Sequence, residues 1–167
     1  MDNIFLIGFM GAGKSSVAKA ISQKYNKRYI ELDKEIELEA GRSIPNIFEI
    51  YGEVYFRECE TRVLRLIECT DTVISCGGGI VLKDENIELL REKGRIIWLK
   101  AQPLTIYERI KAASERPLLK GNMTPEYIEE LLASRIEKYE RAATDSISTD
   151  YMDIEQSATY IYEKYMK

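Results

Sequence analysis

The run from Gly8 to Ser15 constrains this chain more than any other feature. It reads GFMGAGKS, which matches G-x-x-x-x-G-K-[ST], and it directly follows the short apolar run of residues 3–8. Glycines let the backbone wrap so that its N–H groups face phosphate oxygens, and a following helix adds its positive end. In such a loop Lys14 reaches the β- and γ-phosphates, and Ser15 ligates Mg²⁺. The motif predicts that a nucleoside triphosphate is bound by Gly11, Ala12, Gly13, Lys14, Ser15 and Ser16.

Short apolar runs alternate with helical patterns along the 167 residues, a length that fits one domain. Strands are expected at residues 3–8, 28–33, 72–76, 95–100 and, more weakly, 146–149. Asp84 is expected to cap a helix that ends at Gly94, and Thr124 to cap one that opens with Pro125. Further helices follow the glycine loop, cover residues 53–68 and begin at residue 154. Repeated β-α-β units predict an α/β fold whose five-stranded parallel sheet carries helices on both faces.

Composition excludes several classes of function. The chain has 24 basic and 28 acidic residues and a net charge of −4, so it has no bulk attraction for nucleic acid. It has no histidine, which removes His-based acid–base chemistry and imidazole-ligated zinc. Its three cysteines lack the Cys-x-x-Cys spacing, which favours a reducing cytoplasm over a disulfide framework. The first apolar run is too short to cross a bilayer, so we expect no membrane segment.

Two carboxylates, Glu31 and Asp33, end the second expected strand. Ligands of open parallel sheets lie beyond the carboxyl ends of the strands, where a carboxylate can assist Mg²⁺ or accept a proton from an attacking hydroxyl. A turn or a helix N-cap is the alternative reading of both residues.

The pattern over residues 53–68 places charge inside an apolar stripe. Glu60 falls within that stripe and Arg57 lies at its edge, so the two are expected to pair, either structurally or as part of a site. The stripe itself consists of Phe56, Cys59, Val63, Leu66 and Ile67.

The helix after Pro125 repeats this pattern, with Arg135 on the stripe of Ile128, Leu131, Leu132 and Tyr139. An inward guanidinium keeps its proton and needs an anion, and its planar fork suits a carboxylate. Two such arginines in an acidic protein predict a small acidic substrate. The residues 77–79, all glycine, follow the third strand and form either a second anion-binding nest or a plain tight turn.

The segment 114–124 breaks the helical pattern and reads as a surface loop. Phosphoryl transfer must exclude water, so a closing lid is expected here, at about residues 112–124. Arg116 would stabilise transition-state charge from that lid, Arg109 lies beside it, and Lys120 is expected to be solvated.

Taken together, GFMGAGKSS, ELDKEIE, GRSIPNIFEIYGEVYFRECE, CGGG, RPLL and R-x-x-x-Y resemble the shikimate kinase family. The resemblance runs from about residue 3 to residue 143 and as a set is highly specific. It implies transfer of the ATP γ-phosphate to the 3-hydroxyl of shikimate, on the route to aromatic amino acids. It also implies a three-layer P-loop fold with strand order 2-3-1-4-5 and a substrate-binding segment at about residues 33–61.

The resemblance also implies roles for individual residues. Shikimate would be bound by Asp33, Arg57, Arg135, Gly78 and Gly79. The phosphates and Mg²⁺ would be served by Lys14 and Ser15, the lid arginine would be Arg116, and Arg109 would stack near the adenine. A monomer is expected.

The chain departs from the family at Glu31. Similar proteins usually carry Asp-x-Asp where this chain has Glu31-Leu32-Asp33, so the first carboxylate is one methylene longer. In the family that carboxylate meets Mg²⁺ mostly through water, and the sequence leaves open whether Glu31 does the same.

Two other functions remain open at this point. A related kinase would act on gluconate, another hydroxylated acid or a nucleoside monophosphate, because such enzymes share the loop and the lid. A regulatory module would bind nucleotide without turnover, and the replacement at Glu31 is what suggests it.

Overall fold

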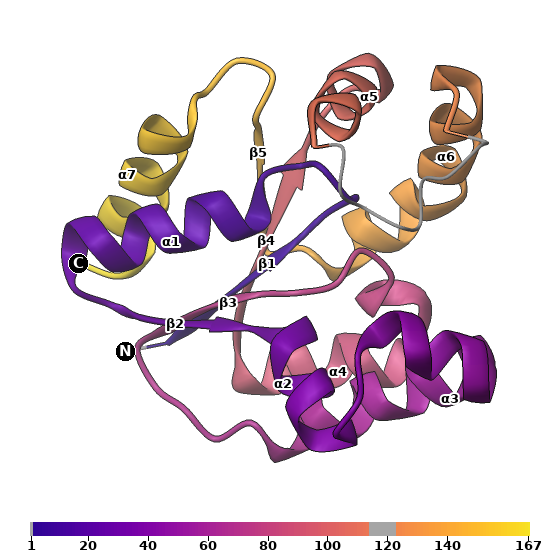
Figure 1. The fold of residues 1–167 in the computed structure, drawn as a ribbon. Coiled ribbons are helices and arrows are strands. Elements are labelled where there is room, and N and C mark those ends of the chain that lie inside the picture. Colours follow the sequence, from indigo (N-terminus) through magenta and orange to yellow (C-terminus); the bar gives the residue numbers. More distant parts are fainter. Residues whose placement is uncertain (1, 114–122) are drawn as a thin grey trace.

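The computed structural model describes residues 2–113 and 123–167 and places a parallel five-stranded sheet at the centre (Figure 1). The strand order is β2-β3-β1-β4-β5, which confirms the predicted order and fold class. The strands are β1 (Asn3–Ile7), β2 (Arg28–Glu31), β3 (Thr72–Ser75), β4 (Gly94–Lys100) and β5 (Asp145–Ser148).

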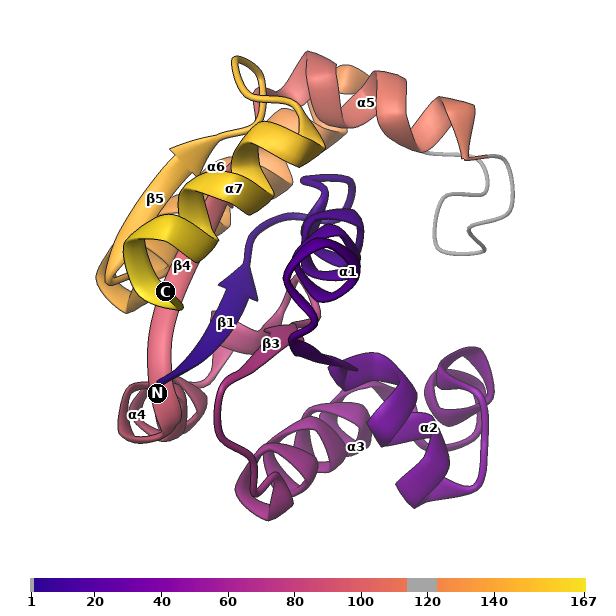
Figure 2. The same cartoon turned by 90° about the vertical axis from the view of Figure 1, so that its left-hand side faces the viewer.

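Side chains alternate between the two faces of the sheet, and each face has its own core. On β1, Ile4 and Leu6 face one layer, where α1 (Lys14–Tyr25) and α7 (Ile154–Tyr165) lie side by side (Figure 2). Phe5 and Ile7 face the opposite core. The helices associated with that core are α2 (Leu32–Ala40), α3 (Ile44–Leu66), α4 (Asp84–Lys93), α5 (Pro103–Ala112) and α6 (Pro125–Ala142). The three layers bring the carboxyl ends of all strands to one edge.

Helices α2 and α3 pack against each other beside β2, at the lower right of Figure 1. Helix α3 is interrupted at Gly52, whose φ of 83° and ψ of 175° leave the helical region. A conformation with positive φ suits glycine, so this residue divides α3 into a short and a long part. The long part carries Arg57 and Glu60.

Most expected elements are present, and the differences have local causes. The second strand ends at Glu31, because Leu32 and Asp33 already belong to α2, a helix that the sequence pattern did not predict. The helix expected over residues 53–68 begins earlier, at Ile44, and ends at Leu66. Leu66 was wrongly placed on the buried stripe, since it lies at the end of the helix with 67% of its surface exposed.

Helix ends follow the expected capping chemistry with one exception. The Tyr127 N–H donates to Thr124 Oγ1, and Pro125 opens α6, as predicted. Gly94 ends α4 as predicted and also begins β4. Asp84 was wrong as the N-cap: Lys83 holds that position, and Asp84 instead places its carboxylate in the first turn. No helix in the two described stretches combines the length and hydropathy that crossing a bilayer requires.

Candidate active site

The glycine loop at residues 8–13 joins β1 to α1 and folds around the lysine that follows it. Gly8, Gly11 and Gly13 have φ values of 146°, 79° and 98°, which L side chains rarely adopt. The buried Lys14 ammonium donates to the carbonyl oxygens of Gly8 at 2.8 Å and Phe9 at 3.0 Å. The loop therefore wraps around the ammonium group of Lys14.

A cavity of about 610 Å³ adjoins this loop. Its walls come from residues 11–17, from the end of α5, from Thr149, Met152 and Asp153 between β5 and α7, and from Ile154 at the start of α7. The sequence pattern did not point to this last segment, because no residue type in it marks a site. This cavity is mainly hydrophobic and lies next to the phosphate-binding end of α1.

Arg109 connects the two walls of the cavity. Its guanidinium donates to the Gly11 carbonyl at 3.1 Å, to Thr149 Oγ1 at 3.0 Å and to the Thr149 carbonyl at 2.9 Å. The glycine loop and the end of β5 are thereby held together by one planar cation. The side chain lines the cavity, as expected of a residue near a nucleotide.

The Ser15 hydroxyl lies at the carboxyl ends of β2 and β3. It donates to Glu31 Oε1 at 2.6 Å and lies 3.2 Å from Ser75 Oγ, and Glu31 and Ser75 are paired in the sheet. The longer Glu31 side chain therefore reaches the predicted Mg²⁺ ligand directly. Across residues 2–113 and 123–167, no three acidic or cysteine side chains gather as a metal cage.

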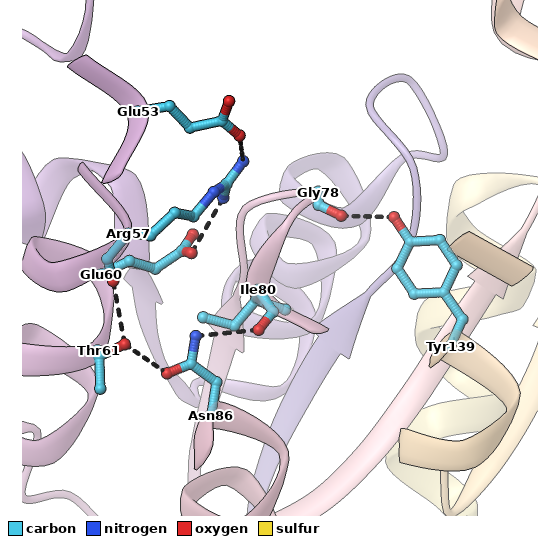
Figure 3. A network of polar contacts seen from close by, with 8 residues as sticks. All are labelled: Glu53, Arg57, Glu60, Thr61, Gly78, Ile80, Asn86 and Tyr139. Atoms are coloured by element: carbon cyan, nitrogen blue, oxygen red, sulfur yellow. Dashed lines mark hydrogen bonds and ion pairs between the residues drawn. The ribbon is translucent and has the colours of Figure 1, made fainter. Parts of the chain in front are cut away.

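Arg57 and Glu60 form the ion pair that the helical spacing predicts (Figure 3). Arg57 Nη1 donates to Glu60 Oε1 at 3.0 Å, and Nη2 lies 3.4 Å from Glu53 Oε1. Glu60 is completely buried, whereas Glu53 is exposed. The buried carboxylate thus fixes the direction of the Arg57 side chain.

The three glycines at residues 77–79 are surrounded by these same charged groups. An ideal Cβ on Gly77 would lie 3.0 Å from Asp33 Oδ1 and 3.1 Å from Glu60 Oε2. One on Gly79 would lie 2.4 Å from Arg57 Nη1. The turn brings together side chains from α2 and α3 that are separated in sequence.

Buried polar atoms without a partner mark the space beside this turn. Among the described residues, Asp33 Oδ1, Arg57 Nε and Glu60 Oε2 are buried and make no hydrogen bond. Burial raises the pKa of Asp33 against the pull of Lys14, and burial raises the pKa of Glu60 against the pull of Arg57. Folded proteins rarely leave such atoms unsatisfied outside functional sites.

Arg135 approaches the same turn from α6. An ideal Cβ on Gly78 would lie 3.7 Å from Arg135 Nη1, and the Arg135 guanidinium lies 5.6 Å from the centre of the Phe9 ring. Within the described part of the chain it makes no ion pair with a carboxylate, unlike Arg57. A half-buried cation beside the glycine turn and the phosphate-binding loop is arranged to meet an anion.

Three residues support the turn, and none of them was assigned that role from the sequence. The Tyr139 hydroxyl donates to the Gly78 carbonyl at 2.5 Å, and Asn86 Nδ2 donates to the Ile80 carbonyl at 3.0 Å (Figure 3). The Thr61 hydroxyl lies 2.8 Å from Asn86 Oδ1 and links that amide to α3. Tyr139 was assigned to an apolar stripe and ends the R-x-x-x-Y motif, but neither pattern gave it a contact with the glycine turn. Buried Asn and Thr give no periodic signal in a sequence.

The remaining predicted residues are only partly placed. Ser16 is exposed in the first turn of α1 and lines the cavity. Arg116, Lys120 and most of the expected lid lie outside the described residues. The site is therefore described without the segment where a lid is expected.

Comparisons with known proteins agree with this geometry. The family model for shikimate kinase matches residues 10–166. A shikimate kinase of Persephonella marina is 43% identical over 143 residues, which cover 85% of this chain and 86% of the relative. One of Thermodesulfovibrio yellowstonii is 40% identical over 166 residues, covering 99% and 95% of the two chains.

A solved structure gives the same result in three dimensions. The shikimate kinase of Acinetobacter baumannii in complex with shikimate superposes with a TM-score of 0.89 at 32% identity. The match covers 98% of this chain and 92% of that one. With its phosphate-binding loop, its glycine turn and its two arginines in place, the chain belongs to the shikimate kinase family.

Proposed function

We propose that this protein transfers the γ-phosphoryl group of ATP to the 3-hydroxyl of shikimate, giving ADP and shikimate 3-phosphate. The observation that carries the proposal is the convergence of Asp33, Arg57 and Arg135 on the glycine turn beside Lys14. Family membership and the shikimate complex of the Acinetobacter baumannii relative support the choice of substrate.

Binding requires a partner for the carboxylate of shikimate. Arg135, near Gly78, is available to this anion because it pairs with no carboxylate in the described stretches. Glu60 holds Arg57 against the next glycine, Gly79. Guanidinium–carboxylate pairs are strong and directional, so they would fix the ring as well as bind it. We assign substrate binding to residues 33–61 together with Gly78, Gly79 and Arg135.

Asp33 is proposed to accept the proton of the attacking hydroxyl. The hydroxyl oxygen forms a bond to the γ-phosphorus, the bond between that phosphorus and the β,γ-bridging oxygen breaks, and ADP leaves. The proton passes to the Asp33 carboxylate and then to solvent. The raised pKa of Asp33, caused by burial, makes it a better acceptor than an exposed aspartate.

The loop residues are proposed to hold the nucleotide. Lys14 and the N–H groups of residues 11–16 would contact the phosphates, and Arg109 would border the adenine in the 610 Å³ cavity. Ser15 would hold Mg²⁺, which when bound neutralises charge on the β- and γ-phosphates. Arg116, on a lid at residues 112–124, would contribute a further positive charge.

We also propose that the protein works as a monomer in the cytoplasm. The three cysteines are unpaired thiols, which suits a reducing compartment.

A coupled ADP-release assay tests the proposed reaction and its alternatives. The purified protein receives ATP, Mg²⁺ and one acceptor at a time: shikimate, gluconate, GMP or none. We expect turnover with shikimate that greatly exceeds the rate without an acceptor. A higher kcat/KM with gluconate or GMP would favour a related kinase, and nucleotide binding without turnover would favour a regulatory module.

A further inference from the structure

Glu31 receives hydrogen bonds on both of its carboxylate oxygens. Ser15 Oγ donates to Oε1 at 2.6 Å, and the Tyr29 hydroxyl donates to Oε2. Tyr29 and Glu31 are two residues apart on β2, so their side chains point to the same face of the sheet. Tyr29 packs against the core formed with α1, which holds its ring in place.

The donors in this cluster can be assigned by elimination. A carboxylate only accepts, so the single proton of Ser15 is given to Glu31. Ser75, 3.2 Å away, must then donate to Ser15. A serine hydroxyl has one proton and two lone pairs, so one lone pair of Ser15 remains for a metal ion. The Tyr29 hydroxyl has one proton, and it donates this proton to Glu31 Oε2.

We propose that Tyr29 is a positioning residue for the Mg²⁺ site: its hydroxyl fixes the Glu31 carboxylate, which in turn orients Ser15 toward the metal. The proposal rests on the proposed function, in which Ser15 holds Mg²⁺. It explains how the chain uses the longer Glu31 side chain. One carboxylate oxygen of Glu31 accepts from Ser15, and the other accepts from Tyr29 on the same strand. These two hydrogen bonds restrict rotation about the extra side-chain bond that glutamate has and aspartate lacks.

The test measures metal binding rather than turnover. Mn²⁺ is titrated into the protein–ADP complex and followed by electron paramagnetic resonance, with Mg²⁺ as competitor, for the wild type, Tyr29→Phe, Glu31→Gln and the double variant. Removing residues behind a metal ligand typically weakens affinity by about 10–100-fold. We expect Tyr29→Phe to weaken Mn²⁺ binding by about 10-fold and the double variant to bind no more weakly than Glu31→Gln.

Controls separate positioning from a general structural effect. Tyr162→Phe removes a hydroxyl from a ring that stacks on Tyr25 in α1, and it should leave Mn²⁺ affinity unchanged. Metal-free ADP affinity and the melting temperature should be nearly equal in wild type and Tyr29→Phe.

Three results would overturn the proposal. They are unchanged Mn²⁺ affinity in Tyr29→Phe, losses that add fully in the double variant, or an equal loss of metal-free ADP affinity. Because shikimate is absent, the proposal can fail while shikimate phosphorylation stands, and the reverse also holds.

Discussion

The Arg57 guanidinium lies directly against the backbone of Gly79, so that an ideal Cβ there would be 2.4 Å from Nη1 and 2.5 Å from Nη2. Gly79→Ala must therefore displace the end of a flexible side chain rather than backbone. We expect the variant to fold normally but to raise KM for shikimate at least 10-fold, because Arg57 loses its position. Steady-state kinetics and thermal melting measure the two effects.

Gly94→Ala provides the contrast for that variant. A Cβ on Gly94 would lie 2.3 Å from the Asn3 carbonyl oxygen, which belongs to the sheet and cannot move easily. This variant should lose stability while its folded fraction keeps a normal KM. A Gly79→Ala protein that melts early with an unchanged KM would show that the contact is structural only.

Arg135→Ala should raise KM for shikimate by about 10–100-fold, which corresponds to losing charge-assisted hydrogen bonds of about 1.5–3 kcal/mol. ATP affinity should change little. Arg141→Ala on the same helix is the control, because its side chain pairs with exposed Asp84. A similar loss of ATP affinity in Arg135→Ala would mean that this arginine faces the nucleotide.

Asp33→Asn should lower kcat by about 10²–10⁴-fold, the usual contribution of a general base. In the wild type, activity requires ionised Asp33, so kcat/KM should rise with pH through a pKa above the ordinary aspartate range. In Asp33→Asn, the residual kcat/KM should no longer fall as pH is lowered through this range. If kcat is unaffected by the substitution, Asp33 takes no part in the chemistry.

The same substitution should stabilise the fold at neutral pH. Burial raises the folded-state pKa of Asp33, so the folded protein favours the protonated carboxyl. The contribution of Asp33 to stability is therefore fully present below its unfolded-state pKa and is lost as pH rises through its folded-state pKa. Asp33→Asn should therefore melt above wild type at pH 7–8, and the difference should shrink toward pH 4. Urea unfolding across this range checks the sign, and a gain that grows as pH falls would contradict it.

Tyr139→Phe removes the hydrogen bond to the Gly78 carbonyl. We expect a loss of about 1 kcal/mol in the free energy of unfolding and a several-fold rise in KM for shikimate, because the turn loosens. Tyr127→Phe, exposed on the same helix, should change neither quantity. Denaturant titration and steady-state kinetics measure the two effects. If Tyr139→Phe lowers the free energy of unfolding but leaves KM at the wild-type value, Tyr139 does not hold the turn for substrate binding.

The sequence was sufficient for the sheet and for the phosphate-binding loop. Buried parallel strands are continuous apolar runs, and the loop motif specifies backbone conformation through its glycines. The Arg57–Glu60 pair also followed from helical spacing alone, since the two lie three residues apart.

The remainder depends on contacts between distant segments. Helix α2 was missed because its short sequence, LDKEIELEA, has mainly polar residues and only two buried ones. Tyr139 lies 61 residues from Gly78, and Thr149 lies 40 residues from Arg109. No local pattern records such pairs, so the supporting residues of the site appeared only in three dimensions.

The most direct test of the account is the product balance of one reaction. The protein is incubated with ATP, Mg²⁺ and shikimate, and phosphorus NMR follows ADP and the phosphorylated acceptor together. The account predicts one shikimate 3-phosphate for each ADP, with both signals largely lost in Asp33→Asn. ADP accompanied only by inorganic phosphate, or no ADP at all, would contradict it.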